Sequence, residues 1–485
     1  MTGGATSDAT ADGHDGVEGR RAAGRALRER APLAAHALWS TDDGARHDPV
    51  ALLEEQDAAR ESDLVPVRHG RMLVSPFTFY RGAARIMAAD LAGTPTSGLT
   101  VQLCGDAHLS NFGLFASPER VLLFDLNDFD ETLPGPFEYD VKRMAASFTV
   151  AAGHNGFDPS ECREITRAAV RAYREAMREF ALMRTMDIWY ARRAEDQLVA
   201  AVEEAARQQK DRASKGIAKD AARAAKRGAR KARTRDSLQA LSKLAERVDG
   251  TYRIVSAPPI VVPARDLATD IGVSADELRD MIDQQFAAYR ATLQDDRRQL
   301  LERFEIVDMA RKVVGVGSVG TLAFIVLLQG RGEDDPLFLQ VKEAGPSVLE
   351  DHLPASRYAN PGERVVQGQR LMQASSDIFL GWSRGVREGR TFYWRQLRDM
   401  KMSADVEAMN PISMDLYARE CGWTLARAHA RSGDPVAIAG YLGKRDDFDR
   451  AVAEFSRSYA DQNRSDHDAF AEAVRTGRLS SVDGV

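Results

Sequence analysis

A short polar loop, Gly105–Asn111, carries residue types whose chemistry suits phosphate transfer. Asp106 and Asn111 lie five residues apart in this loop, so both side chains can face one site. An aspartate can accept the proton of an acceptor hydroxyl, and an asparagine can hold Mg²⁺ by its amide oxygen. His108, between them, can orient Asp106 or contact a substrate, although a packed loop histidine is an equal alternative.

The segment after this loop favours a metal site over a simple turn. The apolar run 121–126 is typical of a strand, and its end opens an acid-rich stretch that contains Asp125, Asn127, Asp128 and Asp130. A carboxylate at the end of such a strand can complete the hard oxygen shell that Mg²⁺ requires. In the alternative, the segment is a polar hairpin whose Asp and Asn side chains cap turns. The apolar strand with several carboxylates behind it favours the metal site.

A glycine-rich stretch follows much later in the chain, between two strand-like runs. Its candidate phosphate-binding residues are Gly315, Gly317, Ser318 and Gly320. In a dinucleotide-binding loop the glycines lead into a helix, whereas the apolar run 321–328 predicts a strand here. The pattern therefore favours a strand–turn–strand cover over phosphates.

The next strand, LQVKEA, contains Lys342, 22 residues after the last of these glycines. Kinases place the lysine that pairs with the α- and β-phosphates in such an apolar strand. A lysine that faces water from an edge strand is the alternative. Its carboxylate partner is expected at the start of the predicted helix 361–374, where Glu363 is favoured over Glu343 and Glu350.

The elements that must position these residues follow changes of character along the chain. Residues 1–20 are rich in Gly, Ala, Thr and Asp and are predicted to form a disordered tail. Residues 21–300 are predicted to form a helical lobe with the polar loop and the acidic hairpin. Residues 301–403 are predicted to form a small antiparallel sheet lobe with the glycines and the lysine, and residues 404–485 the helices that complete the helical lobe. The expected fold class is α+β.

The composition excludes several classes of protein. Lys and Arg number 66 and Asp and Glu 72, which gives a net charge of −6 and no general affinity for nucleic acid or an anionic membrane. The longest apolar run, 322–328, is too short to cross a bilayer, and the start of the chain lacks a signal-peptide pattern. The three cysteines form no CxxC pair, so a cytoplasmic protein is expected. The basic segment 206–235 is the one hint of nucleic acid, and a solvated helix face is the favoured interpretation.

The stretches CGDAHLSNFG, VLLFDLNDFDE and GPFEYDVKR resemble the core motifs of the aminoglycoside phosphotransferase and choline-kinase branch of the protein-kinase-like superfamily. This resemblance implies that Asp106 is the catalytic aspartate, Asn111 a metal ligand, and Asp140 a residue that braces the loop from the start of a helix. Two residues match the metal-binding aspartate of that pattern. Counting forward from Asn111 favours Asp125, and counting back from Asp140 favours Asp128, which we prefer.

A longer resemblance covers residue 70 to about residue 470. The pieces SPFTFYRGAARIMAADL, QVKEAGPSVLE, RVVQGQRLMQ and YWRQLRDMK are similar to the domain of unknown function 2252 family, an uncharacterised bacterial family. This implies a kinase-like fold and names no substrate. The chain departs from the kinase pattern at Cys104, where a supporting histidine often stands, and in its order, because the glycines and Lys342 follow the polar loop. The order implies a two-lobed, cyclically permuted kinase-like fold, which is tolerable where chain ends lie at an exposed surface.

These residues together support an ATP- and Mg²⁺-dependent phosphotransferase as the leading hypothesis. The acceptor stays open: the aminoglycoside-kinase resemblance suggests a small-molecule hydroxyl, and a protein or a nucleotide is also compatible. The alternative is a pseudokinase, a nucleotide-binding module that regulates a partner. The complete set of Asp, Asn, Asp and Lys argues against this alternative, and Mg²⁺-dependent turnover of ATP distinguishes the two.

Overall fold

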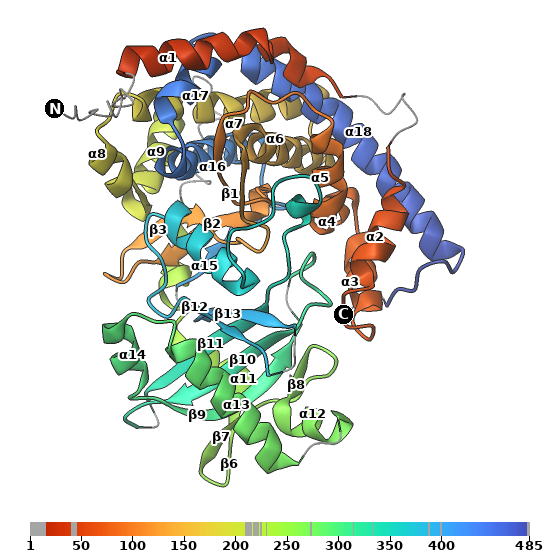
Figure 1. Ribbon diagram of the computed structural model, residues 1–485, viewed down its shortest axis with the longest axis vertical. Helices are drawn as coiled ribbons and strands as arrows, with labels where there is room; N and C mark the ends of the chain where they lie inside the picture. Colours follow the sequence, from red (N-terminus) through yellow and green to blue (C-terminus); the bar gives the residue numbers. More distant parts are fainter. Residues whose placement is uncertain are drawn as a thin grey trace, which may run out of the picture.

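A computed structural model describes residues 16–39, 46–208, 216, 223, 226–228, 230–271, 274–313, 315–332, 334–386, 389–397 and 400–482. The class is mixed α+β, as predicted, with a helical half above a half built on an antiparallel sheet in Figure 1. Within these residues, no helix combines the length and the apolar character needed to cross a membrane. Residues 1–15 and much of the basic segment 206–235 lie outside the described residues, and so do the predictions made for them.

Four long helices form the centre of the helical half. They are α6 (Phe137–His154), α7 (Pro159–Phe180), α16 (Pro411–Ser432) and α18 (Asp447–Arg475). Polar caps fix where two of them begin: Glu161 accepts from the N–H of Asp158 at α7, and Asn410 accepts from the N–H of Ser413 at α16. α6 is buried along almost its whole length, because α7 and α18 pack against it.

Five shorter helices precede the polar loop. They are α1 (Val17–Ala26), α2 (Pro49–Asp57), α3 (Val65–Leu73), α4 (Pro76–Gly82) and α5 (Ala84–Ala92). α1 begins inside the predicted tail, so that prediction is wrong for its first turn. Gly24 of α1 packs on α17 (Pro435–Leu442), where a Cβ would lie 2.0 Å from the carbonyl oxygen of Ala437. The contact needs a small residue and not an apolar one, so the hydrophobic pattern could not reveal it.

Short antiparallel strands hold the polar loop on the helical half. They are β1 (Thr100–Leu103), β2 (Phe112–Ala116), β3 (Leu122–Leu126) and β4 (Leu133–Pro136). β1 leads into the loop and pairs with β4, whereas β2 leaves the loop and pairs with β3. β3 is buried over its whole length. Because its last residue, Leu126, pairs with Phe112 at the end of the polar loop, the acid-rich turn that follows β3 lies beside this loop. The strand predicted at 121–126 is confirmed.

The other half is built on one antiparallel sheet of six strands. In spatial order these are β12 (Gly381–Arg384), β13 (Thr391–Gln396), β11 (Pro336–Glu343), β10 (Ala323–Gln329), β9 (Glu305–Lys312) and β8 (Val261–Pro263). The glycine stretch connects β9 to β10, and Lys342 lies near the end of β11. The predicted sheet around these residues is confirmed, with β8 as an additional edge strand.

Helices cover both faces of this sheet. α13 (Ala275–Arg290) packs on one face, where the ring of Tyr289 stacks on Trp394 with 4.5 Å between centroids. α11 (Ser237–Leu244) packs against Phe338, whose side chain lies on the opposite face because neighbouring residues of a strand alternate. Helices α11 and α13 thus bury apolar side chains on the sheet, although they precede residue 300 and fall within the range predicted as the helical lobe.

Two chain segments that join the halves lie side by side. The N–H of Met400 donates to the carbonyl of Arg235 at 2.8 Å, and the Arg235 guanidinium donates to the carbonyl of Lys401 at 3.0 Å. β14 (Met402–Ser403) then pairs with β2 on the helical half. Helix α15 (Pro361–Met372) contacts both halves, with β12 and β13 on one side and α16 on the other (Figure 1).

Candidate functional site

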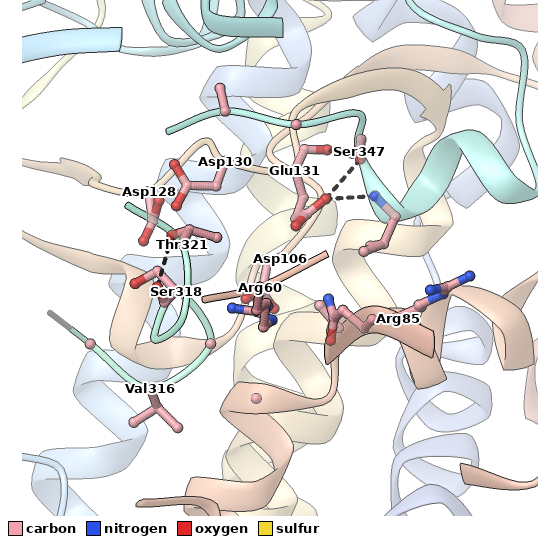
Figure 2. Close-up of a pocket in the computed structure, with 18 of the residues that line it drawn as sticks. Arg60, Arg85, Asp106, Asp128, Asp130, Glu131, Val316, Ser318, Thr321 and Ser347 are labelled. Atoms are coloured by element: carbon pink, nitrogen blue, oxygen red, sulfur yellow. Dashed lines mark hydrogen bonds between the residues drawn. The ribbon is translucent and has the colours of Figure 1, made fainter. Parts of the chain in front are cut away.

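A cavity of about 410 Å³ lies between the halves, where the glycine loop (Gly315–Gly320) faces the polar loop (Figure 2). The predicted site residues that line it are Asp106, His108, Asn111, Asp128, Gly315, Gly317 and Ser318. Lys342 borders the cavity through its contact with Asp130, which does line it. Asp125, Gly320 and Glu363 are not among the residues of its wall.

Asp140, near the start of α6, holds the beginning of the polar loop. Its carboxylate accepts from the N–H groups of Cys104 at 2.8 Å and Gly105 at 3.0 Å, and it lies 3.2 Å from Nε2 of His429. Gly105 has a φ of +84°, and a Cβ there would lie 2.2 Å from the carbonyl oxygen of Glu131. Glycine is therefore required at this turn, and Asp140 has the bracing position that the resemblance implied.

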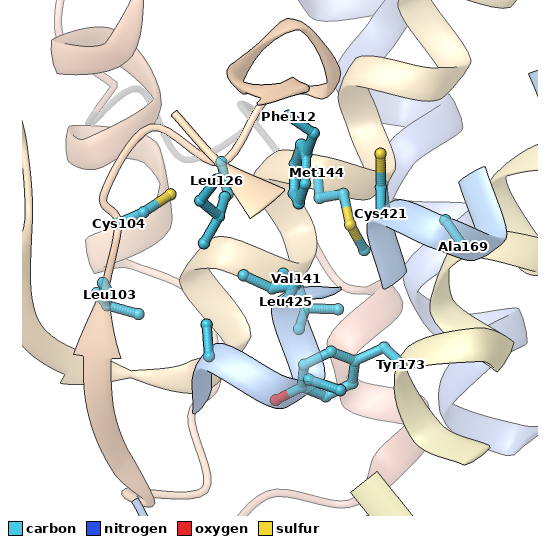
Figure 3. Close-up of a cluster of buried hydrophobic side chains, with 14 of the residues drawn as sticks. Leu103, Cys104, Phe112, Leu126, Val141, Met144, Ala169, Tyr173, Cys421 and Leu425 are labelled. Carbon is cyan, nitrogen blue, oxygen red and sulfur yellow. The ribbon is translucent and has the colours of Figure 1, made fainter. Parts of the chain in front are cut away.

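Apolar side chains support the polar loop from the helical half (Figure 3). Leu103 and Cys104 lead into the loop and Phe112 leaves it, and all three are buried in one cluster with Met144 and Leu425. Burial raises the pKa of the Cys104 thiol well above its usual value, so this side chain is a neutral packing group. Apolar contact thus supports the loop at this position.

Asp106 is oriented by Arg143, a residue that the sequence analysis did not single out. Nε of Arg143 donates to Oδ1 of Asp106 at 2.8 Å, and the same guanidinium donates to the carbonyl of Tyr80 at 2.7 Å. Burial acts to lower the pKa of Arg143, but the charge of Asp106 outweighs it and raises that pKa. Arg143 follows Asp140 by one helical turn, and this spacing in EYDVKR is the signal that could have identified it.

His108 and Asn111 occupy the same wall as Asp106. Nε2 of His108 lies 3.6 Å from Oδ2 of Asp106, and burial lowers the pKa of this imidazole to about 4, so it is neutral near pH 7. Nδ2 of Asn111 donates to the backbone carbonyl of Asp106 at 2.6 Å. That bond fixes the amide so that its oxygen is left for a cation or a substrate.

The two candidate metal aspartates have different environments. Asp125 is 1% exposed, and its carboxylate accepts from Arg427 at 2.5 Å and from the N–H of Ala374 at 2.8 Å. Both oxygens of this carboxylate are therefore already engaged in buried contacts, and the residue does not line the cavity. Asp128 lines the cavity, and its Oδ1 is buried without a hydrogen-bond partner. Of the two, Asp128 has the oxygen that a bound cation would satisfy.

Lys342 connects the sheet half to the acid-rich turn. Its ammonium donates to Asp130 and lies 3.7 Å from Oδ1 of Asp128. The hydroxyl of Tyr393 also donates to Asp130, at 2.6 Å. Burial acts to raise the pKa of Asp128, but the positive charges of Lys342 and Arg395 outweigh it and lower that pKa to about 2. The carboxylate is thus ionised at any ordinary pH.

The carboxylate partner predicted for Lys342 was wrong. Asp130 pairs with it in place of Glu363, while Glu343 pairs with Arg390 and Glu350 lies near Arg364. Strand β11 places the Lys342 ammonium beside the cavity, where it meets Asp130 of the helical half. The repeated acid in DFDE, two residues after Asp128, was the available signal.

The glycine loop is held against the helices that precede the polar loop. Its carbonyl groups accept hydrogen bonds from Arg60 to Val319 at 2.5 Å, from the N–H of Glu61 to Gly320 at 2.8 Å, and from Arg71 to Gly315 at 2.5 Å. Gly315 and Gly320 have φ of +70° and +94°, which explains two of the glycines. The predicted strand–turn–strand arrangement is confirmed.

The comparison with protein families is decisive for membership. Residues 60–473 match the family described as an uncharacterized protein conserved in bacteria (DUF2252). The chain belongs to this family. No curated protein and no solved structure matches the chain. Every residue of the cavity except Glu55, Gln56 and Ala59 lies inside the matched segment.

The DUF2252 cavity offers oxygen ligands that suit Mg²⁺. Among the described residues, no cluster of three or more His, Cys, Asp or Glu side chains forms a ready metal site. Mg²⁺ does not need one, because it takes one or two carboxylates together with substrate phosphates and water. The unsatisfied Oδ1 of Asp128 and the amide oxygen of Asn111 fit that requirement.

Three arginines on the helical side of this DUF2252 cavity were not anticipated. Arg60 follows α2, Arg81 lies in α4, and Arg85 lies in α5. Figure 2 shows Arg60 and Arg85 below Glu131 and Ser347, on the wall opposite them. The sequence offered no spacing rule that would join these residues to the polar loop, because they meet it only through the packing of separate helices.

Proposed function

We propose that this chain is an ATP- and Mg²⁺-dependent phosphotransferase with a kinase-like arrangement of its site. Lys342 meets Asp128 and Asp130 at the cavity that Asp106 and the glycine loop also line, and this juxtaposition carries the proposal. In kinases a lysine on the third strand pairs with phosphates, a glycine loop covers them, and an aspartate accepts the acceptor proton. The proposed class of fold is kinase-like with a cyclically permuted order of elements.

The nucleotide phosphates would lie between the glycine loop and the acid-rich turn. Lys342 would bind their oxygens in place of its present partner Asp130, and Asp128 and Asn111 would hold the Mg²⁺. That ion would supply charge neutralisation at the β- and γ-phosphates. Strand β11 supports this assignment, since it is the third strand counted from the one before the glycine loop and carries Lys342.

Asp106 would act on the acceptor hydroxyl. The acceptor oxygen forms a bond to the γ-phosphorus while the bond from that phosphorus to the β,γ-bridging oxygen breaks, and ADP leaves. The hydroxyl proton passes to the Asp106 carboxylate. Arg143 keeps that carboxylate oriented, and the neutral His108 beside it can exchange a hydrogen bond with the hydroxyl.

A nucleotide-binding pseudokinase is the second candidate, and one observation favours it. The Arg143 guanidinium forms an ion pair with Oδ1 of Asp106, so one oxygen of this carboxylate is already engaged. Such a protein would bind Mg·ATP in the same cavity without turnover. ATP consumption in the presence of Mg²⁺ and candidate hydroxyl acceptors therefore separates the two proposals.

Mg·ATP titration followed by calorimetry, with Lys342→Met as the variant, tests the shared part of both proposals. Loss of the ammonium should weaken binding by about tenfold or more, since charge-assisted contacts to phosphate are strong. Lys243→Met is the matched control, because Lys243 is an exposed lysine on helix α11 of the same half. If wild type and Lys342→Met bind Mg·ATP equally, or neither binds it, the nucleotide site is wrong.

A further inference from the structure

The helical wall of the cavity carries the three arginines, and two of them are already partnered. Arg85 pairs with Glu55 and Asp351, each at 3.2 Å. Arg60 donates to the carbonyl of Val319 and has its Nε 3.6 Å from Asp57. The charges and donors of Arg60 and Arg85 are therefore largely used by contacts with other protein groups.

Arg81 differs from both neighbours. Among the described residues its guanidinium has neither a hydrogen-bond partner nor an ion-pair partner, and its Nε is buried. The charges that act on it most strongly are those of Asp106, Glu407 and Asp128. A half-buried guanidinium without a partner is costly, so a site of this kind is completed by an anion.

The carboxylates around the cavity do not stand in the way of an anionic ligand, because most of them have partners. Asp106 pairs with Arg143, Asp130 with Lys342, and Glu343 with Arg390. Glu131 accepts from the Ser347 hydroxyl and from the N–H of Val348. Arg81 is therefore a cation without an ion-pair partner among the described residues. It lies near Asp106, which the proposed acceptor must approach.

The nucleotide phosphates have other groups to bind them. Lys342, the glycine loop and the Mg²⁺ ligands reach the cavity from the sheet half and the acid-rich turn, whereas Arg81 reaches it from α4. We propose that Arg81 binds a carboxylate or phosphate group on the acceptor, so that the acceptor is an anionic hydroxyl compound. This inference rests on the proposed phosphotransferase for the role of the hydroxyl, while the anion subsite itself stands on Arg81.

Direct binding of small probes tests the subsite without any turnover. Inorganic phosphate, glycolate and the neutral ethylene glycol are titrated by calorimetry into the full chain, with and without a nonhydrolysable Mg·ATP analogue. Phosphate or glycolate should bind in both conditions, and ethylene glycol should not. Phosphate alone indicates a phosphorylated acceptor, and glycolate alone or both together a hydroxy acid.

Arg81→Gln should weaken binding of the anionic probe by about tenfold or more, because a charge-assisted contact is lost. Arg85→Gln is the matched control and should leave the affinity within about twofold, since Arg85 is neutralised by its own carboxylates. Arg81→Lys keeps the charge and should retain part of the affinity if Arg81→Gln folds poorly.

Two outcomes overturn the inference: wild type binds neither anion, or Arg81→Gln and Arg81→Lys both bind the anion as wild type does. Failure of the proposed function gives a different result. In that case the anion binds in an Arg81-dependent manner, but Mg·ATP neither binds nor is consumed. The subsite then stands for a ligand that is not a phosphate acceptor.

Discussion

Lys342 and Asp130 lie 212 positions apart in the sequence, and the ammonium of the first donates a hydrogen bond to the carboxylate of the second across the two halves. The lysine side chain is only 3% exposed. Burial acts to lower the pKa of Lys342, but Asp128 and Asp130 outweigh it and raise that pKa. The pair thus links the two halves beside the cavity, and in the proposed function Lys342 would exchange this partner for phosphate oxygens.

Replacement of Asp106 by Asn should separate binding from chemistry. Mg·ATP affinity should stay near that of wild type, because the proposed function places this carboxylate at the acceptor and not at the nucleotide. Turnover should fall by about 10²- to 10⁴-fold, the usual range for losing a positioned general base. Lys342→Ala should weaken both nucleotide binding and turnover. A steady-state assay of ADP release decides it, and undiminished turnover by Asp106→Asn would remove the role given to this residue.

The two aspartates after the polar loop should behave in opposite ways. In the proposed function, Asp128→Ala should abolish Mg²⁺-dependent ATP binding while the protein stays folded, because its Oδ1 accepts no hydrogen bond and would be a metal ligand. Asp125→Ala should lower the free energy of unfolding by about 3–5 kcal/mol, because it leaves Arg427 as a buried, unpaired charge. Urea unfolding and Mg·ATP titration of both variants test this. If Asp125→Ala is as stable as wild type and loses metal-dependent binding, the two assignments are reversed.

The buried His108 should make stability depend on pH. Its pKa is lowered to about 4, so the unfolded chain binds a proton between the ordinary pKa near 6.5 and pH 4 that the folded chain does not. Stability is then fully present above pH 6.5 and is lost as pH falls toward 4, by about 3 kcal/mol for this group alone. Urea unfolding at pH 7.5 and pH 5 should show a smaller difference in His108→Gln than in wild type. An identical difference would place His108 in water.

Loss of the Asp140 carboxylate should loosen the polar loop. Asp140→Asn removes the charge and one acceptor from the N–H groups of Cys104 and Gly105. The free energy of unfolding should fall by about 1–3 kcal/mol, as for a buried donor left unsatisfied. Hydrogen exchange of those two amides should accelerate, whereas amides of the sheet half should keep their protection. Unchanged exchange at both amides would contradict the bracing role.

The parts of the site that the sequence predicted are those encoded by short-range patterns. Apolar runs predicted the strand that follows the glycines and the strand that follows the polar loop. The structure brings Lys342 and Asp128 together, with 3.7 Å between the ammonium and Oδ1. The ambiguity between Asp125 and Asp128 could not be removed in this way, since it depends on Arg427 from a helix 302 residues away.

What the sequence did not predict depends on contacts between distant segments. Asp130 took the place of Glu363 because the facing half supplies a carboxylate at the lysine, and spacing within one lobe carries no information on that. Arg81 became a cavity residue through the packing of α4 beside the glycine loop, where Gly317 approaches its carbonyl. The packing of α11 and α13 on the sheet was not predicted either, because an amphipathic helix has the same sequence pattern whether it covers a sheet or other helices.

The paired segments at Arg235 and Met400 have a mechanical consequence. They are two neighbouring tethers, joined to each other by backbone and side-chain hydrogen bonds. A rigid body held at such a line turns about it more readily than it slides or twists. Separation of the halves should therefore be a rotation with this pair as its axis. The contacts that it must break include those of Lys342 and Tyr393 with Asp130 and those of Arg60 and Arg71 with the glycine loop.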